Sequence, residues 1–158
     1  MCADKITKEQ RSRNMAAIKG KDTKPEMAVR RFLHSHGFRY RLHVNKLPGK
    51  PDIVLPKYKT AIFVHGCFWH QHKGCQYAYI PKSNTEKWEK KFEQNKIRDR
   101  QVIAEYQQLQ WNPIVVWECE VRNGSFVTRL AEAGLVESVP IPNNENDASR
   151  ILTSRISD

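Results

Sequence analysis

The sequence lacks the features of a disulfide-rich secreted protein and those of a membrane protein. Only four of its 158 residues are cysteine, which is too few for a disulfide framework in a chain of this size. No apolar run approaches the roughly 20 residues of a membrane span. The N-terminus is polar and charged, unlike a signal peptide. We therefore expect no membrane association and a reducing cytoplasm, where clustered cysteine and histidine indicate metal rather than disulfides.

Acidic residues are also in short supply. Asp and Glu number 17 against 27 Lys and Arg, which gives a formal net charge of +10. The end of the chain is locally acidic, so the remainder is more basic than the total suggests. This excess favours a polyanionic partner, nucleic acid first. An ordinary basic protein, such as a ribosomal one, would fit the charge as well.

The length suits a single domain with one core, and the sequence has no internal repeats. From about Glu137 onward the chain contains Pro, Asn and Ser without a periodic pattern. We expect a mobile tail over residues 137–158.

Capping patterns predict where the first helices begin. Thr7-Lys8-Glu9-Gln10 has the form of a capping box and predicts a short helix to about Ile18. Thr23-Lys24-Pro25-Glu26 is a second capping box, followed by a helix that Gly37 closes. On spacing alone, Glu26 is better explained as a cap than as a catalytic group.

A long helix is predicted from about Thr85 to Gln110, and a short one over Ser125–Ala133. The long helix has one inward line at helical spacing. Asn95 and Asp99 are polar members of that line, which would make sense if this part of the helix faced a site. The line comprises Trp88, Phe92, Asn95, Asp99, Val102, Ile103, Tyr106 and Leu109.

Four stretches predict β-strands. Residues 38–44 alternate apolar and basic side chains, and residues 52–55, 60–64 and 114–117 are short apolar runs. Helices and strands therefore alternate along the chain, as in an α/β protein.

Residues 61–75 form the centre of the sequence, with an apolar run that turns into histidine, cysteine and aromatic residues. Cys67, His72 and Cys75 have the spacing of metal ligands, and Cys119 follows a later strand. Together they predict a tetrahedral, structural zinc site of three cysteines and one histidine. The alternative is a set of unrelated cysteines and a surface histidine. Cys2 is left over as a free thiol.

Asp52 follows a proline at the start of a predicted strand. The segment from Asp52 through a short connection to the strand ending in Val64-His65 resembles the PD-(D/E)xK nuclease core. In that core a carboxylate binds a divalent metal such as Mg²⁺. The second acid and the lysine of that motif are absent, and a lone Pro-Asp is also common in turns.

His65 and His70 are the unassigned histidines of the cluster. Phosphodiester hydrolysis needs groups that position or deprotonate water and assist the leaving oxygen, and histidine titrates in the useful range. Either residue could instead be structural, and His70 could compete with His72 for the zinc. Phe68, Trp69 and Trp88 could stack on bases or wedge between them, although aromatic residues more often form core.

Taken together, several segments resemble the very-short-patch repair (Vsr-type) DNA mismatch endonucleases over about residues 7–120. The segments are Arg11–Met15, Asp22–Glu26, Leu47–Asp52, Phe63–His70, Asn95 with Arg98–Arg100, and Val116–Cys119. The resemblance implies a restriction-endonuclease-like fold, with a central mixed sheet flanked by helices and a structural zinc site. It implies an N-terminal DNA-clamping arm over residues 1–20 and an endonuclease domain over residues 21–136.

The resemblance also implies roles for individual residues. Asp52 would bind catalytic Mg²⁺ together with the main-chain carbonyl of Val64, which stands where some members carry threonine. The implied catalytic set is completed by His65, His70, Glu26 and Asp99, and the implied DNA-binding set comprises Phe68, Trp69, Trp88, Asn95, Asn14, Met15, Arg11 and Arg13.

The expected activity is nicking of double-stranded DNA 5′ to the T of a T:G mismatch, as left by deamination of 5-methylcytosine. The expected partners are mismatched DNA, mismatch-repair proteins and a cognate cytosine-5 methyltransferase. The protein is expected to be a monomer in the bacterial cytoplasm, associated with the nucleoid when bound to DNA. Two alternatives remain open: a zinc-stabilised DNA-binding module without catalysis, and a PD-(D/E)xK nuclease without mismatch preference.

Overall fold

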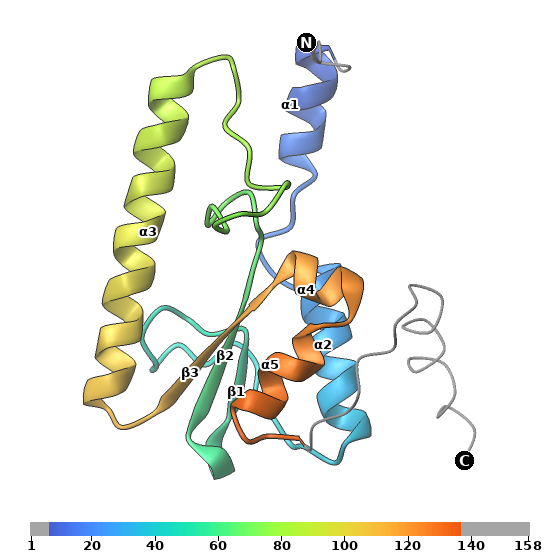
Figure 1. The fold of residues 1–158 in the computed structure, drawn as a ribbon, viewed down its shortest axis with the longest axis vertical. Helices are drawn as coiled ribbons and strands as arrows, with labels where there is room; N and C mark the ends of the chain where they lie inside the picture. Colours follow the sequence, from blue (N-terminus) through green and yellow to red (C-terminus); the bar gives the residue numbers. More distant parts are fainter. Residues whose placement is uncertain (1–6, 137–158) are drawn as a thin grey trace.

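The computed structural model describes residues 7–136, and Figure 1 shows their arrangement. Cys2 and the predicted tail at 137–158 lie outside the described residues. No described helix is long and apolar enough to cross a membrane. The elements are α1 (Lys8–Ala16), α2 (Lys24–Ser35), β1 (Ile53–Leu55), the 3₁₀ turn η1 (Pro56–Tyr58), β2 (Thr60–His65), α3 (Thr85–Gln108), β3 (Asn112–Trp117), α4 (Glu118–Asn123) and α5 (Phe126–Glu132).

A three-stranded mixed sheet with the order β1-β2-β3 lies at the centre of this part of the chain. β1 pairs antiparallel with β2, with Ile53 opposite Ile62, and β2 pairs parallel with β3, with Val64 opposite Val116. In Figure 1, α3 lies on one side of the sheet and α2, α4 and α5 lie on the other. The predicted α/β architecture with a mixed sheet between helices is confirmed.

Alternation along β2 supplies both faces of the sheet with core residues. Ala61 and Phe63 pack with Tyr106 of α3. Ile62 points to the opposite face, where it joins a larger core. That core contains Val29, Phe32 and Leu33 of α2, Ile53 and Leu55 of β1, Ile114 and Val116 of β3, and Phe126 and Leu130 of α5. β2 is therefore packed on both sides, so that its last residues are held rigidly.

The predicted starts of α1 and α2 are confirmed. The Thr7 hydroxyl accepts from the Gln10 N–H at 3.2 Å, and the Gln10 side chain accepts from the Thr7 N–H at 2.9 Å. In α2 the Thr23 hydroxyl accepts from the Glu26 N–H at 3.4 Å. The reciprocal bond of a capping box, from the Thr23 N–H to the Glu26 carboxylate, is not formed. The carboxylate accepts instead from the N–H of Asp22, at 2.8 Å.

Three details differ from the sequence predictions. Residues 38–44 form no named strand, and within them only Arg41 pairs, as an isolated bridge with Val54. The backbone turns away at His43, where φ is 54°. Leu109 follows the end of α3 and is 50% exposed, so it does not continue the inward line. Helix α4 was not predicted, because it starts directly after β3 and spans only six residues.

Candidate active site and metal centre

A cleft of about 1110 Å³ gathers most of the predicted functional residues. Its lining comes from α1, from the end of β2, from the loop that follows β2 and from one face of α3. Among the predicted site residues, the lining includes Arg11, Asn14, Met15, Glu26, Asp52, Val64, His65, Phe68, Trp69, His70, Trp88 and Asp99. Residues that are far apart in the sequence therefore share one concave surface.

Asp52 is held at the point where β1 and β2 diverge. Its Oδ2 accepts from the Val64 N–H at 2.7 Å, and its own N–H donates to the Ile62 carbonyl at 3.1 Å. Burial, helped by the negative charge of Glu26, raises the pKa of Asp52 to about 6, although the Val64 N–H opposes the shift. A carboxylate that is costly to ionise is well suited to bind a cation.

The loop before Asp52 is fixed against α3. At Gly49, where φ is 69°, a Cβ atom would lie 2.6 Å from a methyl group of Val102. The Tyr106 hydroxyl donates to the Pro48 carbonyl at 2.9 Å. Glycine is therefore required by both the backbone conformation and the close approach of α3.

Glu26 is 4% exposed and its carboxylate is fully engaged by α2 and the turn before it. Beside the Asp22 N–H, it accepts from the Thr23 hydroxyl at 3.0 Å and from Arg30 Nη2 at 3.1 Å. Arg30, itself 4% exposed, also pairs with Asp22 at 2.7 Å. Glu26 therefore braces the turn before α2 and also places a negative charge near Asp52.

His65 and His70 lie face to face, with ring centroids 3.7 Å apart and an interplanar angle of 8°. His70 Nδ1 lies 2.6 Å from Asp99 Oδ2 on α3. Burial opposes ionisation of Asp99, but the hydrogen bond from His70 and the positive charges nearby together outweigh it, so that the pKa of Asp99 is lowered. An ionised carboxylate can only accept, so His70 Nδ1 is the donor in this bond and the Nε2 edge of the ring is not used by Asp99.

His65 is neutral at pH 7, because burial and the neighbouring His70 lower its pKa to about 4. The three groups His65, His70 and Asp99 have ligand atoms within 4.8 Å of one another. The prediction that His70 belongs to a different group from the cysteine cluster agrees with this arrangement.

Asn95 anchors the loop after β2 to α3. Its side-chain amide, on a residue that is 6% exposed, donates to the Trp69 carbonyl at 2.8 Å. The polar pair on the inward line of α3 is thereby explained, since Asn95 binds Trp69 and Asp99, one turn later, binds His70.

Phe68, Trp69 and Trp88 form an aromatic cluster on the cleft wall. Phe68 lies 5.2 Å from Trp69 and 5.3 Å from Trp88 between ring centroids, in edge-to-face contacts. Trp69 and Trp88 are 5.9 Å apart. All three are only partly buried, and Phe92 of α3 supports Phe68 from below at 5.2 Å. The cluster is therefore rigid and still presents aromatic surface to the cleft.

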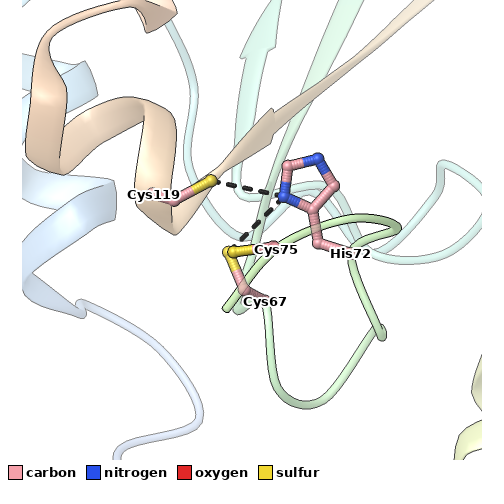
Figure 2. Close-up of side chains that lie close together, drawn as sticks. All are labelled: Cys67, His72, Cys75 and Cys119. Atoms are coloured by element: carbon pink, nitrogen blue, oxygen red, sulfur yellow. Dashed lines mark hydrogen bonds between the residues drawn. The ribbon is translucent and has the colours of Figure 1, made fainter. Parts of the chain in front are cut away.

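Cys67, His72, Cys75 and Cys119 converge as predicted, and Figure 2 shows the Cys119 thiol approaching His72 from the start of α4. His72 Nδ1 lies 3.8 Å from Cys67 Sγ and 3.3 Å from Cys119 Sγ, and all four ligand atoms lie within 4.8 Å of one another. Tetrahedral zinc, with bonds of about 2.0–2.3 Å, requires ligand separations of this size.

The chemistry of the donor set also fits a metal. Burial raises the pKa of the Cys67 thiol to about 12, so that without a cation the thiolate is strongly disfavoured. A zinc ion would reverse this preference. The His72 ring stacks on Trp117 at 4.1 Å and 5°, which fixes its orientation. These four residues can therefore hold a metal without rearrangement.

Helix α1 has no buried residue, and three of its residues line the cleft. Arg11 Nη1 donates to the Ser83 hydroxyl at 3.1 Å, in the segment before α3. Arg13 is exposed and does not line the cleft, unlike the other three predicted arm residues.

Two features were missed at the level of the sequence. Arg30 lies four residues after Glu26, a spacing that could have indicated the buried ion pair. Tyr77 and Tyr79 also line the cleft, and no pattern in the sequence distinguished them from core residues.

Comparison with known proteins identifies the family. The family model for DNA mismatch endonuclease Vsr matches residues 3–76. The chain is 44% identical over 128 residues to the type II nicking enzyme V.XorIIP of Xanthomonas oryzae pv. oryzae, covering 80% of this chain and 93% of that protein. It is 49% identical over 120 residues to the type II nicking enzyme V.NmeAIP of Neisseria meningitidis, covering 76% and 85%. It is 40% identical over 126 residues to the DNA mismatch endonuclease Vsr of Escherichia coli, covering 80% of each. The chain therefore belongs to the Vsr family of DNA mismatch endonucleases.

Proposed function

We propose that this Vsr-family endonuclease uses Mg²⁺ to nick double-stranded DNA 5′ to the T of a T:G mismatch. The observation that carries the proposal is the single cleft, in which Asp52 and the His65–His70–Asp99 group lie beside the Phe68–Trp69–Trp88 cluster. A catalytic group and a rigid aromatic wedge on one surface would couple cleavage to distortion of the duplex.

Asp52 and the main-chain carbonyl of Val64 are the proposed protein ligands of Mg²⁺. When bound, the ion would stabilise the negative charge that develops on the phosphate. The fit rests on Asp52, whose ionisation is opposed by burial and by Glu26, so a cation at this carboxylate would relieve an existing cost. Few protein oxygens are needed, because Mg²⁺ keeps several waters and takes phosphate oxygens.

His70 is the proposed acceptor of the proton from the attacking water, through Nε2. Asp99 holds the opposite ring nitrogen at 2.6 Å, and so fixes the tautomer and the ring orientation. His65 is neutral at pH 7, and its place in the cleft suits hydrogen bonding to water or phosphate rather than proton donation. The fixed charge of Glu26 would add to the attraction for the metal.

Recognition is assigned to the aromatic cluster and to α1. Phe68, Trp69 and Trp88 would insert beside the mismatch, with Asn95 holding the Trp69 backbone in place. Arg11, Asn14 and Met15 face the same cleft, which supports a clamping role for residues 1–20 around DNA. Arg13, outside the cleft lining, would meet the phosphate backbone further along the duplex.

The biological setting is proposed as initiation of very short patch repair after deamination of 5-methylcytosine. The proposed partners are a cognate cytosine-5 methyltransferase and mismatch-repair proteins, and the proposed setting is a monomer in the bacterial cytoplasm. Of the three relatives cited above, two are named type II nicking enzymes and one is named a DNA mismatch endonuclease, which supports strand nicking at mismatches.

The test is nicking of a labelled T:G duplex in Mg²⁺, beside an otherwise identical T:A duplex. Asp52→Ala should lower the nicking rate by on the order of 10³-fold, since several kcal/mol of transition-state stabilisation would be lost. Glu89→Ala, at an exposed position of α3 outside the cleft, is the matched control and should leave the rate unchanged.

Three outcomes would contradict the proposal. Asp52→Ala with wild-type activity would remove the mechanism. Binding without cleavage across many mismatches would favour the non-catalytic DNA-binding module. Equal cleavage of the T:G and T:A duplexes would favour a nuclease without mismatch preference.

A further inference from the structure

The loop between Cys75 and α3 carries two tyrosines on the cleft wall beyond the aromatic cluster. Tyr77 is 40% exposed and Tyr79 is 62% exposed, and both line the cleft. Exposure of aromatic surface to water at the edge of a cleft costs free energy, and contact with a ligand would remove this cost.

Tyr79 extends the aromatic cluster outward. Its ring centroid lies 5.1 Å from that of Phe68, at an interplanar angle of 46°. One part of the Tyr79 ring is therefore supported by Phe68, while most of the side chain faces solvent. A supported ring loses little conformational entropy when a second ring stacks on it.

The loop that carries Tyr79 is fixed at both ends. The Ala78 N–H donates to the carbonyl of the zinc-ligand candidate Cys75 at 3.0 Å. At the other end, the Thr85 hydroxyl lies 3.2 Å from each of the Pro81 and Lys82 carbonyls. Tyr79 is thus presented by a braced segment.

The charges beside this loop favour a polyanionic occupant. The Arg122 guanidinium, which pairs with the cleft residue Glu118 at 2.7 Å, lies 5.1 Å from the Tyr77 ring centroid, and Arg11 reaches the loop through Ser83. A groove with cations and an exposed aromatic ring is typical of nucleic-acid binding, in which the backbone meets the cations and a base stacks on the ring.

We propose that Tyr79 forms a base-stacking subsite that receives a nucleobase unstacked by Phe68 and Trp69. The inference rests on the proposed function, because it is the wedge that would make such a base available. It adds a specificity-determining side chain from outside the wedge, next to the zinc cluster. Stacking uses the π-face of the ring, so the subsite requires an aromatic residue and not the hydroxyl group.

The test compares Tyr79→Phe and Tyr79→Leu. Leucine keeps an apolar side chain against Phe68 but cannot stack, whereas phenylalanine loses only the hydroxyl. Tyr58→Leu is the matched control, since Tyr58 is 44% exposed, lies 5.3 Å from a phenylalanine ring and is outside the cleft. Zinc content and Tm should be equal in all four proteins, which establishes that each is folded.

Binding is measured on a T:G duplex with Ca²⁺ in place of Mg²⁺, to prevent cleavage. Tyr79→Leu should weaken binding at least fivefold, the low end of what one base–aromatic stack provides. Tyr79→Phe and Tyr58→Leu should stay within twofold of wild type. A 2-aminopurine placed on either side of the mismatch should be quenched by wild type and by Tyr79→Phe, and less quenched by Tyr79→Leu.

Wild-type affinity and quenching in Tyr79→Leu would overturn the inference, because no base would then stack on the ring. A loss in Tyr79→Phe as large as that in Tyr79→Leu would also overturn it, because the hydroxyl would then make the contact. If wild type binds the T:G and T:A duplexes equally, the proposed mismatch specificity is wrong. The Tyr79 variants are still scored in that case, on the T:A duplex.

Discussion

Asp52 directly precedes β1, and the surrounding chain largely withdraws its carboxylate from water. One of its oxygens is held by the Val64 N–H, and the buried Glu26 adds a second negative charge nearby. Arg30 compensates this region in part, although its Nε atom is buried without a hydrogen-bond partner. The site is therefore short of positive charge until a cation or a donor group arrives.

This shortage predicts that Asp52→Asn stabilises the protein at neutral pH in the absence of Mg²⁺. The pKa of Asp52 is raised from 3.8 to about 6, so the folded protein binds this proton more tightly than the unfolded chain does. The contribution of Asp52 to stability therefore falls as the pH rises from about 4 to about 6, and stays low above that range. A shift of this size corresponds to at most ~3 kcal/mol, and we expect a gain of ~1–2 kcal/mol at pH 7.5 because asparagine makes a weaker hydrogen bond.

Urea unfolding of both proteins at pH 7.5 and pH 4 measures the effect. The difference should largely disappear at pH 4, where the wild-type carboxyl is mostly protonated in the folded state. A difference of the same size at both pH values would show that side-chain geometry, and not ionisation, is responsible.

The roles of some single residues could be predicted from the neighbouring sequence, and those of others could not. The cysteine spacing was sufficient to predict the metal cluster, because three of its ligands are local. Spacing could not decide whether His70 or His72 is the metal ligand, since both lie in the same loop. Only their contacts, His70 with Asp99 and His72 with Cys119, distinguish them. Glu26 was expected to form the reciprocal bond of a capping box, but its carboxylate accepts from the Asp22 N–H instead, and its approach to Asp52 depends on how α2 packs.

At the scale of elements, α3 is the part that organises the site. Asn95 and Asp99 lie one turn apart, and each binds one of two consecutive residues in the loop after β2. Helix α3, with 24 residues, holds Asn95 and Asp99 at a fixed separation. Its C-terminal part packs on the sheet and its N-terminal part belongs to the aromatic cluster.

Asn95→Ala is predicted to impair both stability and recognition. The Trp69 carbonyl would lose its donor, which costs about 1–3 kcal/mol when the group stays buried. Trp69 would then be less well positioned, and binding to a T:G duplex should weaken more than binding to a T:A duplex. Chemical unfolding and fluorescence anisotropy measure the two effects.

Gln94→Ala, the exposed neighbour on α3, is the control and should change neither quantity. If Asn95→Ala lowers stability while the ratio of T:G to T:A affinity is unchanged, the bond to Trp69 is structural and does not serve recognition.

The regular elements were predicted where local signals are strong. Capping boxes located α1 and α2, and the inward line located α3 up to its last turn. The strand expected at 38–44 failed for an instructive reason: Phe38, Tyr40 and Leu42 do pack inward, but core contact alone does not create a ladder. The restriction-endonuclease-like fold class is confirmed by the mixed sheet between helices together with the family.

At the scale of the whole molecule, the cysteine cluster links two segments that leave the sheet side by side. Cys67 and Cys75 belong to the loop after β2 that carries the aromatic residues, whereas Cys119 lies in the first turn of α4, directly after β3. A zinc ion would tie this loop to the start of α4.

Cys119→Ser is therefore predicted to lose zinc and to lower Tm by about 10 °C or more, because the free energy of a structural zinc site contributes to folding. Metal content by mass spectrometry and calorimetry are the measurements. Cys2→Ser, a thiol outside the cluster, should retain zinc and the wild-type Tm. Stoichiometric zinc with an unchanged Tm in Cys119→Ser would exclude the site.

The cleft itself could not have been predicted, because it depends on distances between segments that lie far apart in the chain. The place of Tyr79 in the cleft follows only from how the loop after Cys75 packs against Phe68. Charge and aromatic content indicated nucleic acid, but which rings face the ligand is decided by packing. In the described residues, Phe92 is buried and Tyr79 is exposed, although both are aromatic neighbours of Phe68.

Trp69 and His70 are adjacent in the chain, and α3 binds the first through Asn95 and the second through Asp99. The same helix therefore holds both residues, each through its own hydrogen bond. Because the two residues share a peptide bond and the same supporting helix, we expect that a ligand which displaces the Trp69 indole would also disturb the orientation of the His70 imidazole.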